Sequence, residues 1–369
     1  MKNFKSFIAL AAAIAVLSSC SNDYQAEQTP VDISSTKHQL ISSNLVGTIA
    51  RAKGYLVWIE SDNGKVVLYD YDIARDTHFL ISEINSRPPF SLTSDGNTVF
   101  WVESGLDKGS STVIIQSYDL EKKARTVVFK KLGRIIGDIA VDGGTIYYFM
   151  GGSNQNGLYA LNTHTGITKL ISYSPRENMI VVDGIMLWIA EEQTSSVDKP
   201  GSLTKTIHLA KLDGTIKDNV IAETGGCPIS YERQGDIIIY SACVEALEQV
   251  YVFNLSSGTT RALTTKPSLR PSISGARISW IENGTNSTRT SSLQVADSSI
   301  KANDMSANYT IAMQAHTGIV DAVLLSQSKV AVSINNSDKP GLSLYIVDLD
   351  HGTVQLGTDV RSNNRIANP

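Results

Sequence analysis

A segment that occurs seven times constrains this 369-residue chain most, because all four of its tryptophans occupy the same place in that segment. In each copy this anchor residue stands inside an apolar run, as in Val99-Phe100-Trp101-Val102. Three copies have another residue at the anchor. The seven anchors, spaced 40 to 52 residues apart, are Trp58, Trp101, Tyr148, Trp188, Tyr240, Trp280 and Val332. Self-similarity at such a period is typical of repeat architectures.

Each copy has the pattern of four short strands joined by tight turns. Turns such as Ser94-Asp95-Gly96 and Asp142-Gly143-Gly144 precede the anchor strand, and such turns between β-branched runs indicate hairpins. Four antiparallel strands per copy, repeated seven times, predict an all-β protein, a seven-bladed β-propeller of four-stranded antiparallel blades. Because the anchor strand is apolar throughout, we expect burial on both faces, with the anchor filling the space between neighbouring blades.

Two segments compete for the place that closes the ring. His38-Gln39-Leu40-Ile41-Ser42 is similar to His78-Phe79-Leu80-Ile81-Ser82, a predicted fourth strand, and would complete the last blade. The segment from Thr353 to Gly357 could take the same place. Either arrangement would cover a sheet edge that otherwise favours aggregation. The predicted propeller spans residues 38–360, followed by a C-terminal tail at 361–369.

The N-terminal residues have the pattern of a signal peptide. Lys2 and Lys5 form a short positive region, residues 7–17 are apolar, and Leu17-Ser18-Ser19-Cys20 follows. These last four residues resemble the lipobox of bacterial lipoproteins. The resemblance implies removal of residues 1–19, attachment of lipid to Cys20, and a lipid-anchored protein of the bacterial cell envelope, periplasmic or surface-facing at the outer membrane.

The polar segment 20–37 is then expected to be a flexible tether between the lipid and the propeller. The alternative is a soluble secreted protein in which Cys20 has no special role.

The copy at residues 88–120 has the pattern Pro-x-x-Ser-x-x-x-Asp-Gly…Trp…Tyr-Asp-Leu. It resembles the propeller repeats of the TolB and WD40-like family of bacterial envelope proteins, although the Gly-His and Trp-Asp pairs of true WD40 repeats are missing. The likeness covers all seven copies and implies a propeller of the cell envelope. Function does not follow from such a likeness of fold alone.

The first strand of each blade is expected to line a central channel. Ten residues before the anchor the residue is polar in six of seven copies, whereas nine before it is apolar or proline throughout. Period-two alternation therefore places the first set in the channel and the second in the blade. The channel set is Thr48, Ser91, Asp138, Asn178, Ser230, Arg270 and Ala322. The alternative is a water-filled channel without a ligand.

Cations recur at the start of the first strands. Arg87, Arg134 and Lys266 lie fourteen residues before their anchors, at the expected channel mouth. Such a collar would favour an anionic guest, for example a carboxylate-bearing sugar or an acidic peptide. The alternative is a set of surface ion pairs of small energetic value, such as Arg87 with Glu103.

Cysteine and histidine suggest structure rather than chemistry. Cys227 and Cys243 align at the open end of one hairpin, so we predict a disulfide between them in an oxidising compartment. The six histidines have no metal-ligand spacing, and no phosphate-binding loop or nucleophile motif occurs, so neither a metal nor a cofactor is expected. With 32 Lys and Arg against 36 Asp and Glu, the charge argues against a nucleic-acid partner.

Two functions fit these patterns. The favoured hypothesis is a monomeric, lipid-anchored propeller that acts as a non-catalytic binding or scaffold module for an envelope protein partner or a glycan. The rival hypothesis is a propeller-type lyase or hydrolase acting on an anionic glycan or a lactone at the channel mouth. In that case Arg87, Arg134, Asp138 and Arg270 would form the functional group, with Asp138 as the base.

Overall fold

The computed structural model describes most of the chain from His38 onward. The chain divides into two units, and all described residues belong to the second unit, Ser35–Pro369. The predicted signal peptide, tether and Cys20 lie outside the described residues. The described residues are 38–62, 64–84, 91–107, 110–151, 156–172, 177–193, 203–216, 218–224, 230–244, 247–283, 291–297, 309–313, 317–336, 342–349 and 354–356. Within these ranges there is no α-helix, and so no helix long and apolar enough to cross a membrane.

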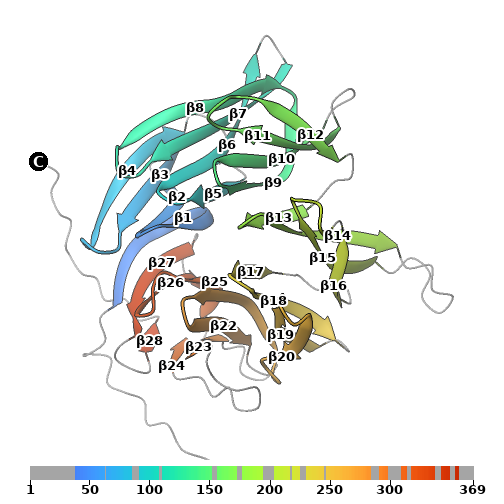
Figure 1. The fold of residues 1–369 in the computed structure, drawn as a ribbon. Helices are drawn as coiled ribbons and strands as arrows, with labels where there is room; N and C mark the ends of the chain where they lie inside the picture. The colour runs from blue at the N-terminus through green and yellow to red at the C-terminus, as the bar shows by residue number, and fades with distance from the viewer. Residues whose placement is uncertain are drawn as a thin grey trace, which may run out of the picture. The chain divides into compact units, whose positions relative to one another are not determined.

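The strands form seven four-stranded antiparallel blades in a ring, which is the predicted β-propeller (Figure 1). Blades are numbered 1 to 7 in chain order, and in each blade the first strand lies nearest the centre of the ring. The first strands are β1 (His38–Ala52), β5 (Leu92–Asp95), β9 (Arg134–Asp142), β13 (Glu177–Val182), β17 (Tyr231–Gln234), β21 (Ser268–Ser274) and β25 (Thr317–Leu324). The second strands are β2 (Tyr55–Asp62), β6 (Thr98–Asp107), β10 (Thr145–Gly151), β14 (Ile185–Gln193), β18 (Ile237–Val244), β22 (Arg277–Asn283) and β26 (Lys329–Asn336).

The outer half of each blade consists of the third and fourth strands. The third strands are β3 (Lys65–Asp72), β7 (Ser110–Asp119), β11 (Gly157–Asn162), β15 (Leu203–Lys211), β19 (Leu247–Asn254), β23 (Ser291–Asp297) and β27 (Leu342–Asp348). The fourth strands of blades 1 to 6 are β4 (Thr77–Ile84), β8 (Ala124–Leu132), β12 (Thr168–Ser172), β16 (Asn219–Thr224), β20 (Thr259–Ala262) and β24 (Tyr309–Met313).

The N-terminal strand closes the ring. β1 is 15 residues long, and its two halves belong to different blades. From His38 it pairs antiparallel with β27 as the fourth strand of blade 7, whereas residues 49–52 pair with β2 as the first strand of blade 1. Of the two competing segments, residues 38–42 therefore take the closing position. The other segment forms β28 (Val354–Leu356), which pairs in parallel with β24 at the edge of blade 6.

Every anchor residue is buried in the second strand of its blade. Trp58 and Trp101 have no exposed surface, and the other five anchors are at most 3% exposed. Among the described residues the core consists of seven clusters, each joining two neighbouring blades around one anchor. Burial on both faces is confirmed, because Leu56 and Trp58 belong to the cluster shared with blade 7, whereas Val57 and Ile59 belong to that shared with blade 2.

Candidate functional site

The first strands bring their residues to the centre of the ring. In five blades the pairing of first and second strands shifts register at or beside the position ten residues before the anchor. A bulge of this kind re-aims a side chain and increases the local twist. Asn178 and Arg270, both at that position, have φ angles of 47° and 51°. Non-glycine residues rarely adopt this left-handed conformation, which marks both as candidates for a functional role.

The predicted alternation is confirmed for the face that packs into the blades. All residues nine before the anchor are buried or half-buried: Ile49, Leu92, Ile139, Met179, Tyr231, Pro271 and Val323. On the other face, Asn178 and Arg270 are exposed and Asp138 is half-buried. Ser91 and Ala322 differ from the expectation, since each is 2% exposed. Ser91 Oγ accepts a hydrogen bond from Ile139 N of the next blade at 3.0 Å, and Ala322 packs in the core cluster between blades 6 and 7.

A polar network joins four blades near the closing seam of the ring. Arg51, in β1, donates from Nη1 to the carbonyl oxygens of Ile273 at 3.0 Å and Leu324 at 2.6 Å, in blades 6 and 7. Glu232, in β17 of blade 5, accepts hydrogen bonds from Ile273 N at 2.8 Å and from Ser272 Oγ at 3.1 Å. Because every partner belongs to another blade, these side chains hold the first strands together.

Three carboxyl groups of the first strands have raised pKa values. Burial raises the pKa of Asp321, and the charge of Arg270 opposes this rise. Arg270 Nη1 lies 3.8 Å from Asp321 Oδ1. Burial also raises the pKa of Glu232, which the charge of Arg51 lowers in part. It raises the pKa of Asp138 as well, which a hydrogen bond with Ser91 lowers in part. Each of these groups therefore keeps its proton to a higher pH than a solvated carboxyl group does.

Carboxylates at the far end of the first strands tie each blade to the next. Asp142 accepts hydrogen bonds from Asp183 N at 3.1 Å and Gly184 N at 2.8 Å, both in blade 4. Asp95 Oδ2 accepts one from Gly144 N of blade 3 at 2.9 Å. Asp95 and Asp142 both stand six residues before their anchors. The turn motif that predicts hairpins therefore also joins neighbouring blades.

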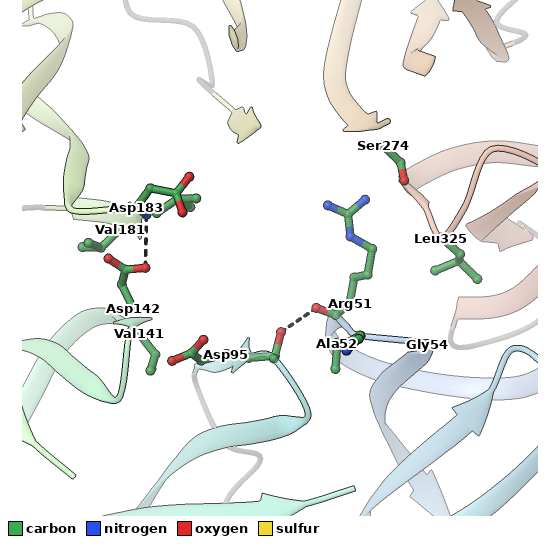
Figure 2. Close-up of a pocket in the computed structure, with 14 residues that line it drawn as sticks. Arg51, Ala52, Gly54, Asp95, Val141, Asp142, Val181, Asp183, Ser274 and Leu325 are labelled. Carbon is green, nitrogen blue, oxygen red and sulfur yellow. Dashed lines mark hydrogen bonds between the residues drawn. The ribbon is translucent and has the colours of Figure 1, made fainter. Parts of the chain in front are cut away.

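The turns between first and second strands surround a pocket of about 460 Å³. Figure 2 shows Arg51, Asp95, Asp142 and Asp183 around this space. Asp183 differs from the other carboxylates, since its side chain is 72% exposed and lies 3.8 Å from Arg233 Nη1. Within the described ranges no hydrogen bond reaches its carboxylate. The residues lining the pocket are Arg51, Ala52, Lys53, Gly54, Ser94, Asp95, Gly96, Val141, Asp142, Val181, Val182, Asp183, Ser274 and Leu325.

The predicted cationic collar belongs to the opposite end of the first strands from this pocket. Arg134 is exposed at the start of β9. Lys266, just before β21, has its Nζ 2.8 Å from Glu282 Oε1. Arg87 lies outside the described residues. The structure thus pairs Lys266 with an acid, whereas Arg134 is open to solvent.

One cysteine lies among the described residues. Cys243, in β18, is disulfide-bonded. Cys227, its predicted partner, lies outside the described residues, so the pairing itself stays a prediction. In the part of the chain that the structure describes, no group of three or more His, Cys, Asp or Glu side chains is arranged to hold a metal ion.

One hydrogen-bonded chain in blade 4 has the residue types of a catalytic relay. His208 Nδ1 lies 2.7 Å from Asp218 Oδ1, and its Nε2 lies 2.8 Å from Thr206 Oγ1. Acid, imidazole and hydroxyl follow in the order of a nucleophilic triad. However, Thr206 is 3% exposed, and the imidazole stacks on Trp188 with ring centroids 5.2 Å apart. Because the hydroxyl is closed to a substrate, we interpret this chain as structural.

Several residues of the site are missed by the sequence patterns. Asp95 stands in a turn motif that is interpreted only as a hairpin signal, and Asp183 precedes a glycine in the corresponding turn of blade 4. Glu232 continues the channel-facing alternation that begins at Ser230, and this signal is available in the sequence. Nothing in the sequence distinguishes Arg51, since its role depends on which blades meet at the seam.

Comparison with known proteins identifies the fold and no family. No family model matches the sequence, and a search of the curated proteins finds no match. Among solved structures, an oligogalacturonate lyase from Vibrio parahaemolyticus is similar with a TM-score of 0.59 and 11% identity, over 86% of this chain and 95% of the lyase. The β-propeller domain of the Trilobed protease from Pyrococcus furiosus is similar with a TM-score of 0.57 and 10% identity, over 83% and 93% of the two chains.

These likenesses support the propeller fold alone. The Pyrococcus domain is described as having an open velcro topology, whereas here β1 pairs with β27 across the seam. TolB from Acinetobacter baumannii also matches, with a TM-score of 0.40 and 15% identity over 82% of each chain. A TM-score this low carries no argument about function.

Proposed function

We propose that this protein is a monomeric, lipid-anchored β-propeller of the bacterial cell envelope that binds a glycan or a protein partner without chemistry of its own. The pocket at the turn end of the ring is the observation that carries this proposal. A concave site with a few polar groups at fixed positions is the usual form of a ligand site. Here backbone amides of the next blade fix Asp95 and Asp142 in place.

The chemistry of the pocket wall favours a ligand that donates hydrogen bonds. Asp183 offers an exposed carboxylate with no hydrogen bond from the described residues, and a carboxylate is an acceptor only. Hydroxyl and ammonium groups of a sugar or of a basic peptide would satisfy it. The anionic guest expected from the cationic collar is a separate candidate at the opposite end, supported by the exposed Arg134.

Two charged trisaccharides test the pocket. We expect a glucosamine trimer, which carries ammonium groups, to bind in titration calorimetry, and Asp183→Asn to weaken binding about tenfold through loss of a charge-assisted hydrogen bond. Glu223→Gln, on the exposed strand β16, removes the same charge away from the pocket and serves as the control. Tighter binding of a galacturonate trimer, weakened by Arg134→Gln, would favour the collar instead.

The lipid anchor has its own test. The resemblance of Leu17-Ser18-Ser19-Cys20 to a lipobox supports acylation of Cys20, and several acyl chains would anchor the protein firmly. In cells given labelled palmitate, we expect the wild-type protein to carry label and to remain in the membrane fraction after a high-salt wash. Cys20→Ser should carry none, and a variant that keeps the label would contradict the proposal.

The rival function is a lyase or hydrolase with Asp138 as the base. Its support is the half-buried position of Asp138, whose pKa burial raises, together with the fold shared with an oligogalacturonate lyase. Turnover of the galacturonate trimer that Asp138→Asn abolishes would replace the binding proposal with this one.

A further inference from the structure

The outer strands of four consecutive blades expose large apolar side chains. In the described residues these side chains lie on or beside β4, β8, β12 and β16, in blades 1 to 4. They are Phe79, Leu80, Val127, Leu132, Ile167, Ile171 and Val220, with exposed fractions from 41% to 68%. Val127 and Leu132 lie on the same strand, β8, and exposed apolar side chains that lie together are typical of an interaction site.

The outer strand of blade 2 and the residues directly before and after it are also strongly basic. Residues 121–134 contain six Lys and Arg and one Glu, in a chain whose net charge is −4. Lys122, Lys123 and Arg125 form ion pairs with acids of blades 1 and 2. Lys130 and Lys131 are exposed on β8, as is Arg134 beyond its end. Here "the β8 surface" means Val127, Lys130, Lys131 and Leu132 of β8, a strand at the outer edge of the ring (Figure 1).

We infer that the β8 surface docks the propeller on an anionic lipid bilayer, an inference that rests on the proposed envelope location. Cations beside exposed apolar side chains point to this partner. Anionic headgroups attract clustered Lys and Arg, and the neighbouring apolar side chains enter the membrane interface. The neighbouring blades also expose apolar side chains on their outer strands, Phe79 and Leu80 of β4 and Ile171 of β12.

Protection against edge-to-edge pairing does not explain these cations. Lysine on an edge strand discourages the pairing of two sheets. However, β4 and β16 also end their blades and expose Phe79 and Val220, yet neither strand contains Lys or Arg. Two other outer strands, β12 and β20, contain one cation each, Lys169 and Arg261, whereas β8 contains three. The concentration of cations is therefore a property of β8 rather than of open edges in general.

The proposed anchor makes a weak docking surface effective. Seventeen residues separate Cys20 from His38, where β1 begins. A segment of that length spans at most about 60 Å, so a lipid on Cys20 would keep the propeller within a few tens of Å of the bilayer. At such range the local concentration of lipid headgroups is high, and modest contacts suffice.

Vesicle binding by protein that begins at Ser21 tests the inference without the lipid. All seven blades follow residue 37, so this protein keeps every described strand. We expect it to bind vesicles of equal parts phosphatidylglycerol and phosphatidylcholine, and not vesicles of phosphatidylcholine alone. Lys130→Gln with Lys131→Gln should weaken binding about thirtyfold. Val127→Ser with Leu132→Ser should weaken it while leaving its salt dependence unchanged.

The controls separate this surface from net charge and from the anchor. Lys211→Gln with Lys329→Gln removes two charges from blades 4 and 7, and should change binding by less than about twofold. Equal effects of the two lysine pairs, or equal binding to both vesicles, would overturn the inference. Polyglutamate bound as tightly as the vesicles would also overturn it and indicate an acidic protein partner. Because this protein lacks Cys20, palmitate labelling of the full chain tests the anchor separately.

Discussion

Replacing Trp101 with alanine is expected to lower the free energy of unfolding by about 3–5 kcal/mol. The indole has no exposed surface and packs in the cluster between blades 1 and 2. The guanidinium of Arg125 lies 5.4 Å from the ring centroid, and Nε1 donates to Glu103 Oε1 at 2.7 Å. Alanine would leave a cavity in a seam that the rest of the ring prevents from collapsing.

Phenylalanine at two anchors separates the hydrogen bond from the packing. Trp101→Phe removes the donor to Glu103 and leaves most of the space filled. Trp280 Nε1, at the equivalent position of blade 6, has no partner among the described residues. We therefore expect Trp101→Phe to reduce stability by about 1 kcal/mol more than Trp280→Phe does.

Urea titration followed by circular dichroism measures both comparisons. A Trp101→Ala protein within about 1 kcal/mol of the wild type would show that the anchors are not central to the core. Val127→Ser is the control, because that side chain is 56% exposed and its replacement should change little.

The repeat pattern is sufficient to predict the fold, because each blade is specified locally by its turns and its anchor. The anchors identify the seven second strands, and their apolar runs predict burial on both faces. The segment that closes the ring cannot be predicted locally in this way. Residues 38–42 have the sequence of a fourth strand, but residues 353–357 fit the same position equally well from the sequence. Only the structure shows which of the two segments pairs with β27. A choice between two distant segments for one edge is a property of the assembled ring.

The site is less predictable for the same reason. Alternation along one strand indicates which side chains leave the blade, and this places Asp138 and Arg270 correctly at the first strands. It cannot indicate that Arg51 of blade 1 reaches carbonyl oxygens of blades 6 and 7, because that contact joins residues more than 200 positions apart. Asp183 is missed because an Asp-Gly turn has a sufficient local explanation.

Lys123→Met is expected to reduce stability by about 3 kcal/mol near neutral pH, because it leaves a buried carboxylate without its cation. The Asp70 side chain has no exposed surface, and Lys123 Nζ lies 2.8 Å from its Oδ2. Asp70 Oδ1 has no hydrogen-bond partner among the described residues. Methionine keeps the length of the side chain against the rings of Tyr55 and Phe79, which lie 5.4 and 5.1 Å from Nζ.

The loss should depend on pH in a defined direction. Burial raises the pKa of Asp70, and the hydrogen bond and charge of Lys123 oppose that rise. Without Lys123 the pKa rises further, so the folded state binds a proton that the unfolded state has released. The contribution of this carboxyl group to stability then falls as the pH rises above the ordinary pKa of an aspartate in the unfolded chain. We expect the difference between variant and wild type to be smaller at about pH 5 than at about pH 8.

A second substitution should reverse most of the loss. Asp70→Asn removes the buried charge, so Asp70→Asn with Lys123→Met should be more stable than Lys123→Met alone, and its stability should no longer follow the titration of residue 70. Lys122→Met is the neighbouring control, since Lys122 is 79% exposed in its pair with Asp119 and screening by water leaves that pair little energy. The three variants and the wild type are compared by urea titration across the same pH range. If the double variant is as unstable as Lys123→Met, the loss comes from packing around the methionine, and the charge of Asp70 is not its cause.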